Sequence, residues 1–332
     1  MTNIRFLNII AMLACIFVVA CSAPSPQPTT LSTDPLEYWN EGAAKTAILN
    51  FVTAATDSAS PNFIPVADRI ATFDMDGTIL LEKPNYVMFD FIGRLLKPKI
   101  EANPKLKNVQ PCKAFIEKDM AYLASTDPYS EQGLWGLDLY ATEGYTDKQF
   151  NDSLKNYFTT VTDERFGKPY NKLVYPPVVQ LIKYLQEKQF DVYIVSGSDP
   201  YFTRSFCEEA ANIPVKNVIG TTVLSKWVET DSTSYFVRTH EFSNPINDEA
   251  GKPVNILNKI GKVPVFACGN STGDYHMLQF SKTAPFSIQL IVNHDDSVRE
   301  YNYHAEKMKT LCEQKGWQEI SMKNDFKLIF AD

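Results

Sequence analysis

The chain has 332 residues, of which 44% are hydrophobic and 21% are charged. This is an ordinary globular composition, and the length allows a full hydrophobic core together with a second module. The formal net charge is −7. Proteins that bind nucleic acid concentrate Lys and Arg on one face, so the charge balance gives no indication of a nucleic-acid partner.

Residues 1–20 have the pattern of a lipoprotein signal peptide. Arg5 precedes an apolar stretch, residues 6–20, which is shorter than the roughly 20 residues of a transmembrane helix and matches the core of a secretory signal. The stretch ends in the letters VVAC, which resemble a bacterial lipobox, where Cys21 would be lipidated. An ordinary signal peptide cleaved nearby, with an incidental cysteine, is the alternative.

Residues 21–34 are rich in Pro, Ser and Thr and predict an extended tether that buries nothing. We therefore expect an exported bacterial lipoprotein that faces the periplasm and touches the membrane through its lipid anchor only. Ser22, directly after the cysteine, favours sorting to the outer membrane. The pattern does not indicate an oligomeric state.

Four cysteines remain beyond this leader, and an oxidising compartment would permit them to pair. They are Cys112, Cys207, Cys268 and Cys312. Four cysteines allow three pairings, and the sequence does not choose among them.

The first part of the mature chain predicts one helix, one strand and then a helical module. An amphipathic helix is expected over residues 35–56, and an apolar strand over residues 70–73. From residue 83 to residue 170, β-branched runs are almost absent. Helices are expected there over residues 86–96, 112–124, 130–141 and 146–161. Residues 83–170 therefore read as a helical insertion.

Strands and helices alternate in the second part of the chain. Strands are expected over residues 190–195, 215–220, 263–268 and 287–292, with a hairpin over residues 222–228 and 234–240. Helices are expected over residues 178–188, 200–211, 252–261 and 296–315. The alternation predicts an α/β fold with a doubly wound parallel sheet, formed by residues 35–82 and 171–332, and ligands at the carboxyl ends of its strands.

Polar motifs follow three of the predicted strands. They are Asp74, Asp76 and Thr78 after strand 70–73, Ser196 and Gly197 after strand 190–195, and Asn270 and Asp274 after strand 263–268. Because the carboxyl ends of parallel strands meet at one edge of a sheet, we expect these side chains to converge.

This set of residues suits the hydrolysis of a phosphate monoester. Such an ester resists attack because its own charge repels nucleophiles, so a catalyst needs an in-line nucleophile, positive charge and an acid for the leaving oxygen. Asp74 is the candidate nucleophile, which would form an aspartyl-phosphate. Asp76 is the candidate acid and then the base that activates water. Ser196 and the Gly197 amide could bind the phosphoryl oxygens.

In this order the motifs resemble those of the haloacid dehalogenase-like (HAD) phosphatases, over roughly residue 35 to the C-terminus. Residues 39–42, 68–71, 251–254 and 269–271 are similar to one secreted branch of that superfamily, which is described as phosphoserine phosphatase-like and is similar to the phosphorylcholine phosphatases. The resemblance implies a Rossmann-like core, a type-1 helical cap over residues 83–170, and Mg²⁺-dependent hydrolysis of a small phosphorylated metabolite.

The resemblance also implies the metal site. Asp74, the backbone carbonyl of Asp76, Asn270 and Asp274 would hold Mg²⁺, with Mn²⁺ or Co²⁺ as alternatives. Many relatives have Asp where this chain has Asn270. The amide oxygen can still bind the metal, but one negative charge is lost, so metal affinity would be weaker.

A catalytic lysine is expected before the last motif, and three lysines are available there. They are Lys252, Lys259 and Lys262. Lys252 is favoured because it opens a predicted helix, from which its long stem could reach a strand end. Its Gly-Lys-Pro-Val setting also matches the branch.

Thr78 and Glu82 are the further candidate substrate contacts. Phosphoserine phosphatases carry a glutamate for the substrate ammonium, but Glu82 is one residue short of that spacing and Lys83 stands at it. A solvated helix start is the alternative for Glu82. A phosphoserine- or phosphocholine-specific phosphatase therefore remains an alternative, as does a non-catalytic binding lipoprotein. Cap aromatics that could shape the pocket include Tyr86, Phe89 and Trp135.

Overall fold

The computed structural model describes residues 34–303 and 305–331. The predicted signal peptide, residues 21–33 of the predicted tether and the predicted lipidation site Cys21 lie outside the described residues. Within the described part, no helix is both long and apolar enough to cross a bilayer.

A six-stranded parallel sheet forms the core, in the order β3-β2-β1-β6-β7-β8. Its strands are β1 (Ile70–Phe73), β2 (Asp191–Val195), β3 (Val218–Ile219), β6 (Phe266–Gly269), β7 (Ile288–Asn293) and β8 (Gln318–Ser321). Strand β1 lies between β2 and β6, where Phe73 is in register with Ile194 and Cys268. The predicted α/β fold with a parallel sheet is confirmed, and its polar strand ends meet at one edge.

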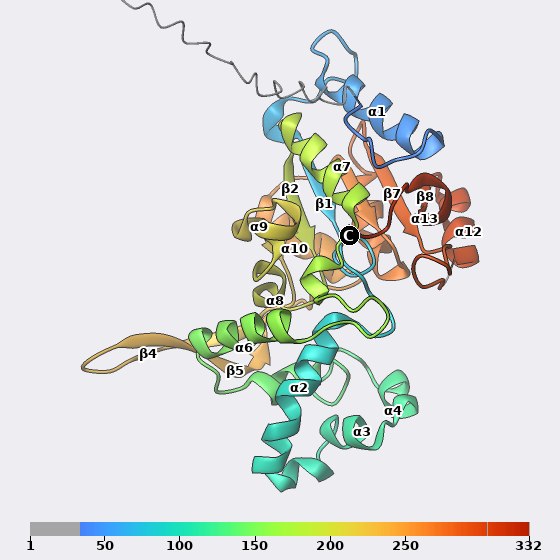
Figure 1. Cartoon of the computed structure of the whole chain (residues 1–332). Helices are drawn as coiled ribbons and strands as arrows, with labels where there is room; N and C mark the ends of the chain where they lie inside the picture. Colours follow the sequence, from blue (N-terminus) through green and yellow to red (C-terminus); the bar gives the residue numbers. More distant parts are fainter. Residues whose placement is uncertain (1–33, 304, 332) are drawn as a thin grey trace, which may run out of the picture. The chain divides into compact units, whose positions relative to one another are not determined.

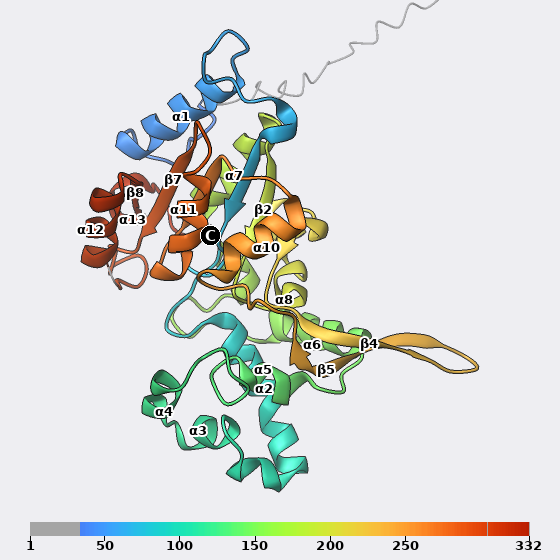
Figure 2. The same ribbon diagram turned by 180° about the vertical axis from the view of Figure 1, so that it is seen from behind.

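Helices cover both faces of this sheet. Helix α7 lies in front of the sheet in Figure 1, and α10 and α11 lie in front of it in the view from behind in Figure 2. The helices outside the insertion are α1 (Ala43–Thr56), α7 (Pro176–Glu187), α8 (Pro200–Arg204), α9 (Cys207–Ala211), α10 (Gly251–Ile260), α11 (Tyr275–Ser281), α12 (Ala305–Lys315) and α13 (Met322–Asp325).

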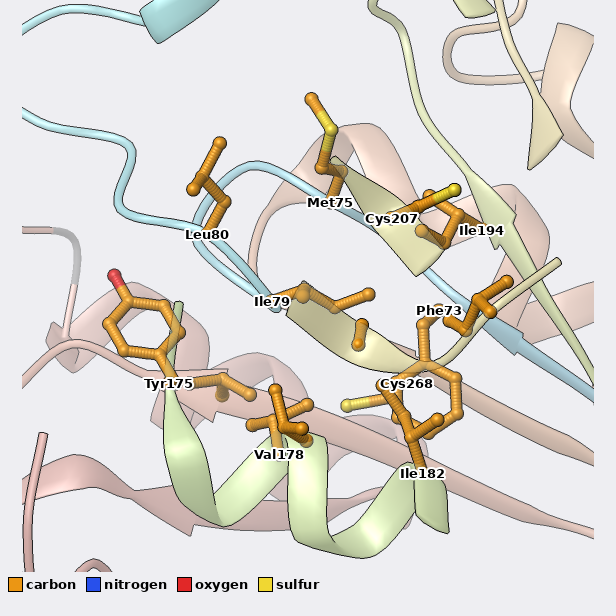
Figure 3. Packing of buried hydrophobic residues seen from close by; sticks show 14 of the residues in the cluster. Phe73, Met75, Ile79, Leu80, Tyr175, Val178, Ile182, Ile194, Cys207 and Cys268 are labelled. Atoms are coloured by element: carbon orange, nitrogen blue, oxygen red, sulfur yellow. The ribbon is translucent and has the colours of Figure 1, made fainter. Parts of the chain in front are cut away.

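The central strand is apolar because both of its faces are covered. All four residues of β1 are buried, as expected of a parallel strand between two helical layers. Phe73 stacks on Phe266 with ring centroids 5.4 Å apart, and Val178 and Ile182 of α7 pack beneath (Figure 3). This packing holds the start of the following polar loop rigidly in place.

The four cysteines of the folded part are buried and free, so the structure contains no disulfide among them. Cys268 lies in β6, and Cys207 lies at the start of α9. Burial raises the pKa of the Cys207 and Cys112 thiols to about 11, so both remain protonated at neutral pH.

The predicted insertion is helical, but its elements differ from the expected ones. It contains α2 (Val87–Ala102), α3 (Cys112–Glu117), α4 (Met120–Ser125), α5 (Gly136–Thr142) and α6 (Asp147–Thr160). The single helix predicted over residues 112–124 is wrong, because Lys118 adopts the left-handed conformation between α3 and α4. The helix predicted to begin at residue 130 begins only at Gly136, and α6 begins at a capping box formed by Thr146 and Gln149.

Three other predicted helices are shorter or broken. The predicted helix over residues 35–56 begins only at Ala43, because the preceding residues bind the C-terminal segment. Trp39 forms a β-bridge with Phe326, and the backbone amide of Asn40 donates to the Asp325 carbonyl. The predicted helix 200–211 is two helices, and the predicted helix 296–315 begins only at Ala305. Strand β8, which completes the sheet, was not predicted.

The predicted hairpin is present as β4 (Val223–Glu229) and β5 (Ser234–Phe242), which pair antiparallel and extend away from the sheet (Figure 1). Its base packs on the helical insertion. The Gly144 amide donates to the Arg238 carbonyl at 3.0 Å, and the Arg238 amide donates to the Tyr145 carbonyl at 2.9 Å. Helices from one part of the chain and a hairpin from another therefore form one layer.

Candidate active site

A cavity of about 230 Å³ opens at the carboxyl edge of the sheet. Its polar wall comes from the strand ends and from α10, and its apolar wall comes from the helical insertion. The residues that line it are Asp74, Asp76, Glu82, Tyr86, Met88, Phe89, Leu134, Trp135, Gly197, Ser198, Asp248, Lys252, Asn270, Ser271, Gly273 and Asp274. The structure thus brings most of the predicted site residues together, with three cap aromatics opposite them.

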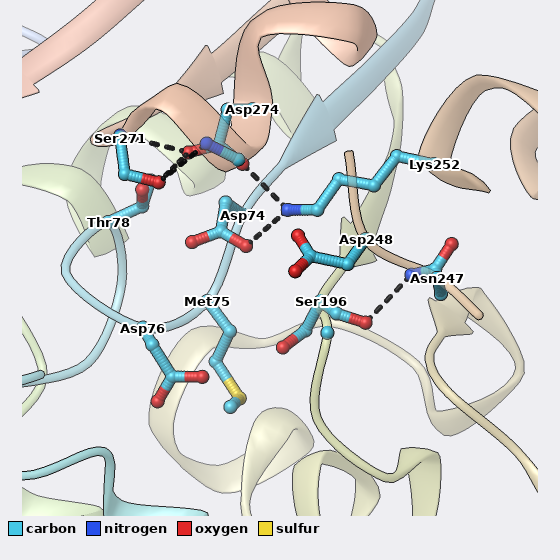
Figure 4. Close-up of polar contacts among 12 residues, drawn as sticks. Asp74, Met75, Asp76, Thr78, Ser196, Asn247, Asp248, Lys252, Ser271 and Asp274 are labelled. Carbon is cyan, nitrogen blue, oxygen red and sulfur yellow. Dashed lines mark hydrogen bonds and ion pairs between the residues drawn. The ribbon is translucent and has the colours of Figure 1, made fainter. Parts of the chain in front are cut away.

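Lys252 lies at the centre of the polar wall (Figure 4). Its Nζ donates to Asp74 Oδ1 and to Asp274 Oδ1, both at 2.6 Å, and its side chain is 3% exposed. Burial alone would lower the pKa of Lys252, but the Asp274 and Asp74 carboxylates outweigh it and raise that pKa, so the amine stays charged. Lys262, by contrast, pairs with Asp68 and is 41% exposed. Of these two lysines, Lys252 is the one that lines the cavity.

Asp74 and Asp76 leave the end of β1 with different surroundings. Burial, reinforced by Asp274, raises the pKa of Asp74 well above its usual range even though Lys252 opposes the change. Asp76 accepts a hydrogen bond at Oδ2 from Ser198 Oγ at 3.0 Å, and its buried Oδ1 has no partner among the described residues. Burial and the nearby Glu82 raise the pKa of Asp76 to about 7. A carboxyl group with this pKa can give and take a proton at neutral pH.

The loop after β6 is held by the second oxygen of Asp274. This Oδ2 accepts from the backbone amides of Asn270 and Ser271, at 3.0 and 3.1 Å. A Cβ atom at Gly269 would lie 2.5 Å from Asp274, so only glycine allows the loop to close this tightly. Asp274 therefore anchors its own loop with one oxygen and Lys252 with the other.

Asn270 lies between this loop and the loop that follows β1. Its Nδ2 donates to Glu82 Oε2 at 2.7 Å, and the Thr78 hydroxyl donates to its Oδ1 at 3.5 Å. Thr78 is fully buried and contacts Asn270, but it is not among the residues that line the cavity. Glu82 lines the cavity, but its oxygens also accept from Lys83 Nζ at 2.9 Å and from the Tyr303 hydroxyl at 2.8 Å. Its role as a substrate contact stays a prediction.

The loop after β2 places its residues differently from the prediction. Ser196 is fully buried, its carbonyl accepts from Asn247 Nδ2 at 2.7 Å, and its hydroxyl accepts from the Ser198 amide at 3.1 Å. The next two residues, Gly197 and Ser198, line the cavity. Ser198, which holds Asp76, was missed by sequence reasoning, although its place at the end of an apolar strand was a usable signal.

Asp248 was also missed. It lines the cavity between Gly197 and Gly273, and its Oδ2 accepts from the Tyr129 hydroxyl of the helical insertion at 3.0 Å. Its only signal in the sequence is its position four residues before Lys252. Asp248 thus connects the polar wall with the apolar wall.

Comparisons with known proteins agree with this arrangement. The sequence model of the haloacid dehalogenase-like hydrolase family matches residues 71–279. A conserved protein of unknown function from Anaerococcus prevotii has a similar structure, with a TM-score of 0.57 and 14% identity over 90% of this chain and 98% of that one. A protein of unknown function from Bordetella pertussis has a TM-score of 0.51 and 14% identity over 76% of this chain and 98% of its own. No curated protein sequence matches the chain. The chain belongs to the haloacid dehalogenase-like hydrolase family.

Proposed function

We propose that this protein is a Mg²⁺-dependent phosphatase that hydrolyses a small phosphomonoester. The observation that carries the proposal is the buried Lys252 ammonium held between Asp74 and Asp274, with Asp76 beside them in the same small cavity. A fixed cation, a carboxylate nucleophile and a carboxyl group with a pKa of about 7 are the parts that phosphoester hydrolysis requires.

The charge of the cavity fits a bound divalent cation. Five carboxylates line it, and Lys252 is the one Lys or Arg among the described residues that do so. A phosphate group would be repelled by this excess of negative charge unless a cation accompanied it. The five carboxylates belong to Asp74, Asp76, Glu82, Asp248 and Asp274.

The donor atoms also suit Mg²⁺, which prefers oxygen. The described residues contain no ready-made group of three or more His, Cys, Asp or Glu that could hold a metal. The fit therefore rests on a mixed set: the carboxylates of Asp74 and Asp274, the backbone carbonyl of Asp76 and the amide oxygen of Asn270. When bound, the metal would neutralise charge on the phosphate; Mn²⁺ and Co²⁺ would accept the same ligands.

The chain's own residues would carry the covalent steps. Lys252 holds one oxygen of Asp74, and its charge together with that of a bound cation would keep this carboxyl ionised against the effects of burial and Asp274 on its pKa. The other oxygen of Asp74 would attack phosphorus. The bond from phosphorus to the leaving oxygen breaks as Asp76 gives that oxygen a proton. Asp76 then takes a proton from a water molecule that attacks the aspartyl-phosphate, which releases inorganic phosphate and restores the Asp74 carboxylate. Lys252 and the Gly197 amide would bind the phosphoryl oxygens.

The apolar wall favours one narrower alternative, a substrate with a cationic group. Tyr86, Phe89 and Trp135 line the cavity, with the Phe89 and Trp135 rings edge to face at 5.6 Å. Aromatic faces attract ammonium groups, and Asp248 lies near them with its charge. A panel of phosphocholine, phosphoethanolamine, phosphoserine, nucleotides and sugar phosphates would distinguish this alternative, because it predicts the highest kcat/KM for phosphocholine or its amine relatives.

The direct test of the proposal is turnover of p-nitrophenyl phosphate with Mg²⁺, in the wild type and in Asp74→Asn. We expect the variant to lose activity by at least about 10³-fold, because the nucleophile is removed, and EDTA to abolish wild-type activity until Mg²⁺ is restored. Asp152→Asn, at a carboxylate 57% exposed on α6, is the matched control and should be fully active. Equal turnover in Asp74→Asn, or none in the wild type with Mg²⁺, Mn²⁺ or Co²⁺, would refute the proposal.

A further inference from the structure

The amide of Asn270 has a donor end and an acceptor end, and its neighbours decide which end faces the site. Glu82 Oε2 lies 2.7 Å from the amide nitrogen, and the Thr78 hydroxyl lies 3.5 Å from the amide oxygen. A carboxylate can only accept hydrogen bonds, so the NH₂ group must face Glu82. The oxygen then faces Thr78, in the loop that also carries Asp74 and Asp76.

Gly77 permits this close contact. Its φ is +77°, and a Cβ atom there would lie 1.9 Å from Asn270 Nδ2 and 2.5 Å from Glu82 Oε2. Any other residue would push the amide and the carboxylate apart. The glycine of the Asp-x-Asp-Gly motif therefore makes room for a pair that is 188 residues apart in the chain.

The Glu82 carboxylate is itself held by neighbouring side chains. It is 3% exposed, and it accepts from the Tyr303 hydroxyl at 2.8 Å and from Lys83 Nζ at 2.9 Å. The Tyr303 ring stacks on His294 with centroids 4.3 Å apart, and His294 Nε2 donates to the Gly77 carbonyl at 2.7 Å. The carboxylate is thus held in a buried network that includes the catalytic loop.

We propose that Glu82 is a positioning residue: it fixes the Asn270 amide with its oxygen toward the loop of Asp74 and Asp76, which would hold the cation, and it adds beside that site the negative charge that Asn270 lacks. The inference rests on the proposed function, because it needs a cation beside Asn270. Groups that orient a metal ligand also raise its ability to donate electrons to the metal. Glu82 is then a partner of the metal ligand rather than a contact of the substrate ammonium.

The pair also leads us to expect that aspartate at position 270 alone would destabilise the site. A carboxylate there would lie about as close to Glu82 as the amide nitrogen does now, and two ionised carboxylates at that distance repel strongly. The reciprocal exchange, Asn270→Asp with Glu82→Gln, would keep both the net charge and one hydrogen bond, now donated by the glutamine.

The experiment measures Mn²⁺ binding to metal-free protein by the electron paramagnetic resonance signal of free Mn²⁺, with no substrate present. We expect Glu82→Gln to weaken binding at least fivefold, because glutamine removes the charge and, having a donor end as well as an acceptor end, no longer forces the Asn270 amide into one orientation. The double variant should recover binding to within about threefold of the wild type. Thermal unfolding without metal should show Asn270→Asp to be destabilised and the double variant to be restored. Glu209→Gln and Asn156→Asp, at exposed positions, are the matched controls.

The outcomes separate this inference from the proposed function. The positioning role is overturned if Glu82→Gln binds Mn²⁺ with wild-type affinity, or if the double variant binds Mn²⁺ as weakly as Glu82→Gln does. In either case, loss of activity in Asp74→Asn would still support the phosphatase. An effect of Glu82→Gln on substrate KM alone would likewise overturn it, because that is the result of a substrate contact. A wild-type protein that binds no Mn²⁺ overturns the inference together with the metal part of the proposed function.

Discussion

At the scale of single residues, the site depends on one buried, positively charged side chain. Lys252 touches Asp74 and Asp274, which come from the ends of two neighbouring strands, so its charge holds two loops in place as well as facing the cavity. A buried charge without its partner costs far more than an exposed one, because water cannot solvate it. Structural and chemical roles are therefore combined in this residue.

Lys252→Met should lower both activity and stability. It leaves two buried carboxylates uncompensated, so we expect the free energy of unfolding to fall by about 3–5 kcal/mol, measured by urea unfolding. Lys262→Met is the matched control: its pair with Asp68 is exposed and should be worth about 0–1 kcal/mol. Equal unfolding midpoints for the two variants would show that the Lys252 contacts do not stabilise the protein.

At the scale of elements, a buried ion cluster joins the hairpin to the helices. Arg238 of β5 donates to Asp199, the N-cap of α8, at 2.7 Å and to Asp138 of α5 at 3.5 Å. Its guanidinium also lies 4.1 Å from the centre of the Phe150 ring of α6. Three helices that are distant from Arg238 in the sequence are thus fixed to its side chain, which positions the layer that carries the apolar wall.

This cluster makes stability depend on pH. Burial, and then Asp199, raise the pKa of Asp138 to about 7 although Arg238 opposes them. The unfolded carboxyl titrates near a pKa of about 3.9, so the native state binds more protons between about pH 4 and pH 7. The contribution of Asp138 to stability is therefore greatest below about pH 4 and is lost as the pH rises to about 7.

Asp138→Asn removes this titration. The thermal unfolding temperature of the wild type, relative to the variant, should fall between about pH 4 and pH 7 and then level off. Asp152→Asn, at an exposed carboxylate, should follow the wild type across the whole range. A wild-type curve parallel to that of Asp138→Asn would show that Asp138 titrates normally.

At the scale of the whole molecule, the two ends of the described chain meet on the sheet. Trp39 packs edge to face on Phe326 with centroids 5.0 Å apart, and its indole donates to the Pro177 carbonyl at 2.9 Å. Strand β8, just before Phe326, pairs with β7 and completes the sheet. The segment before α1 and the C-terminal segment therefore stabilise the core together.

The predicted lipid anchor leads to an expectation for the full-length protein. Cys21→Ser removes the thiol that would carry the lipid, so the protein should move from the membrane fraction to the soluble fraction and lose labelling by radioactive palmitate. Cys312→Ser, at a buried cysteine of α12, should remain with the membrane. A wild type that is already in the soluble fraction and takes up no palmitate would favour the alternative of a cleaved signal peptide with an incidental cysteine.

The sequence alone indicated the parallel α/β fold, the helical insertion, the hairpin and the strand-end positions of Asp74, Asp76 and Asp274. These follow from signals within a few residues of one another: apolar strands, helical periodicity and glycine after a carboxylate. The start of α1, the break between α3 and α4 and strand β8 were not predicted, because local propensity is weak there and contacts with distant segments decide the conformation.

Only the tertiary structure decided which of the converging groups pair with one another. Lys252 reaches Asp74 across 178 residues, and Asn270 reaches Glu82 across 188, distances over which no periodic pattern carries information. The structure likewise buried Ser196 and exposed Ser198 and Asp248 to the cavity. The local motifs indicate the kind of chemistry. Packing, however, determines the partners of each carboxylate, and these partners determine its charge and orientation.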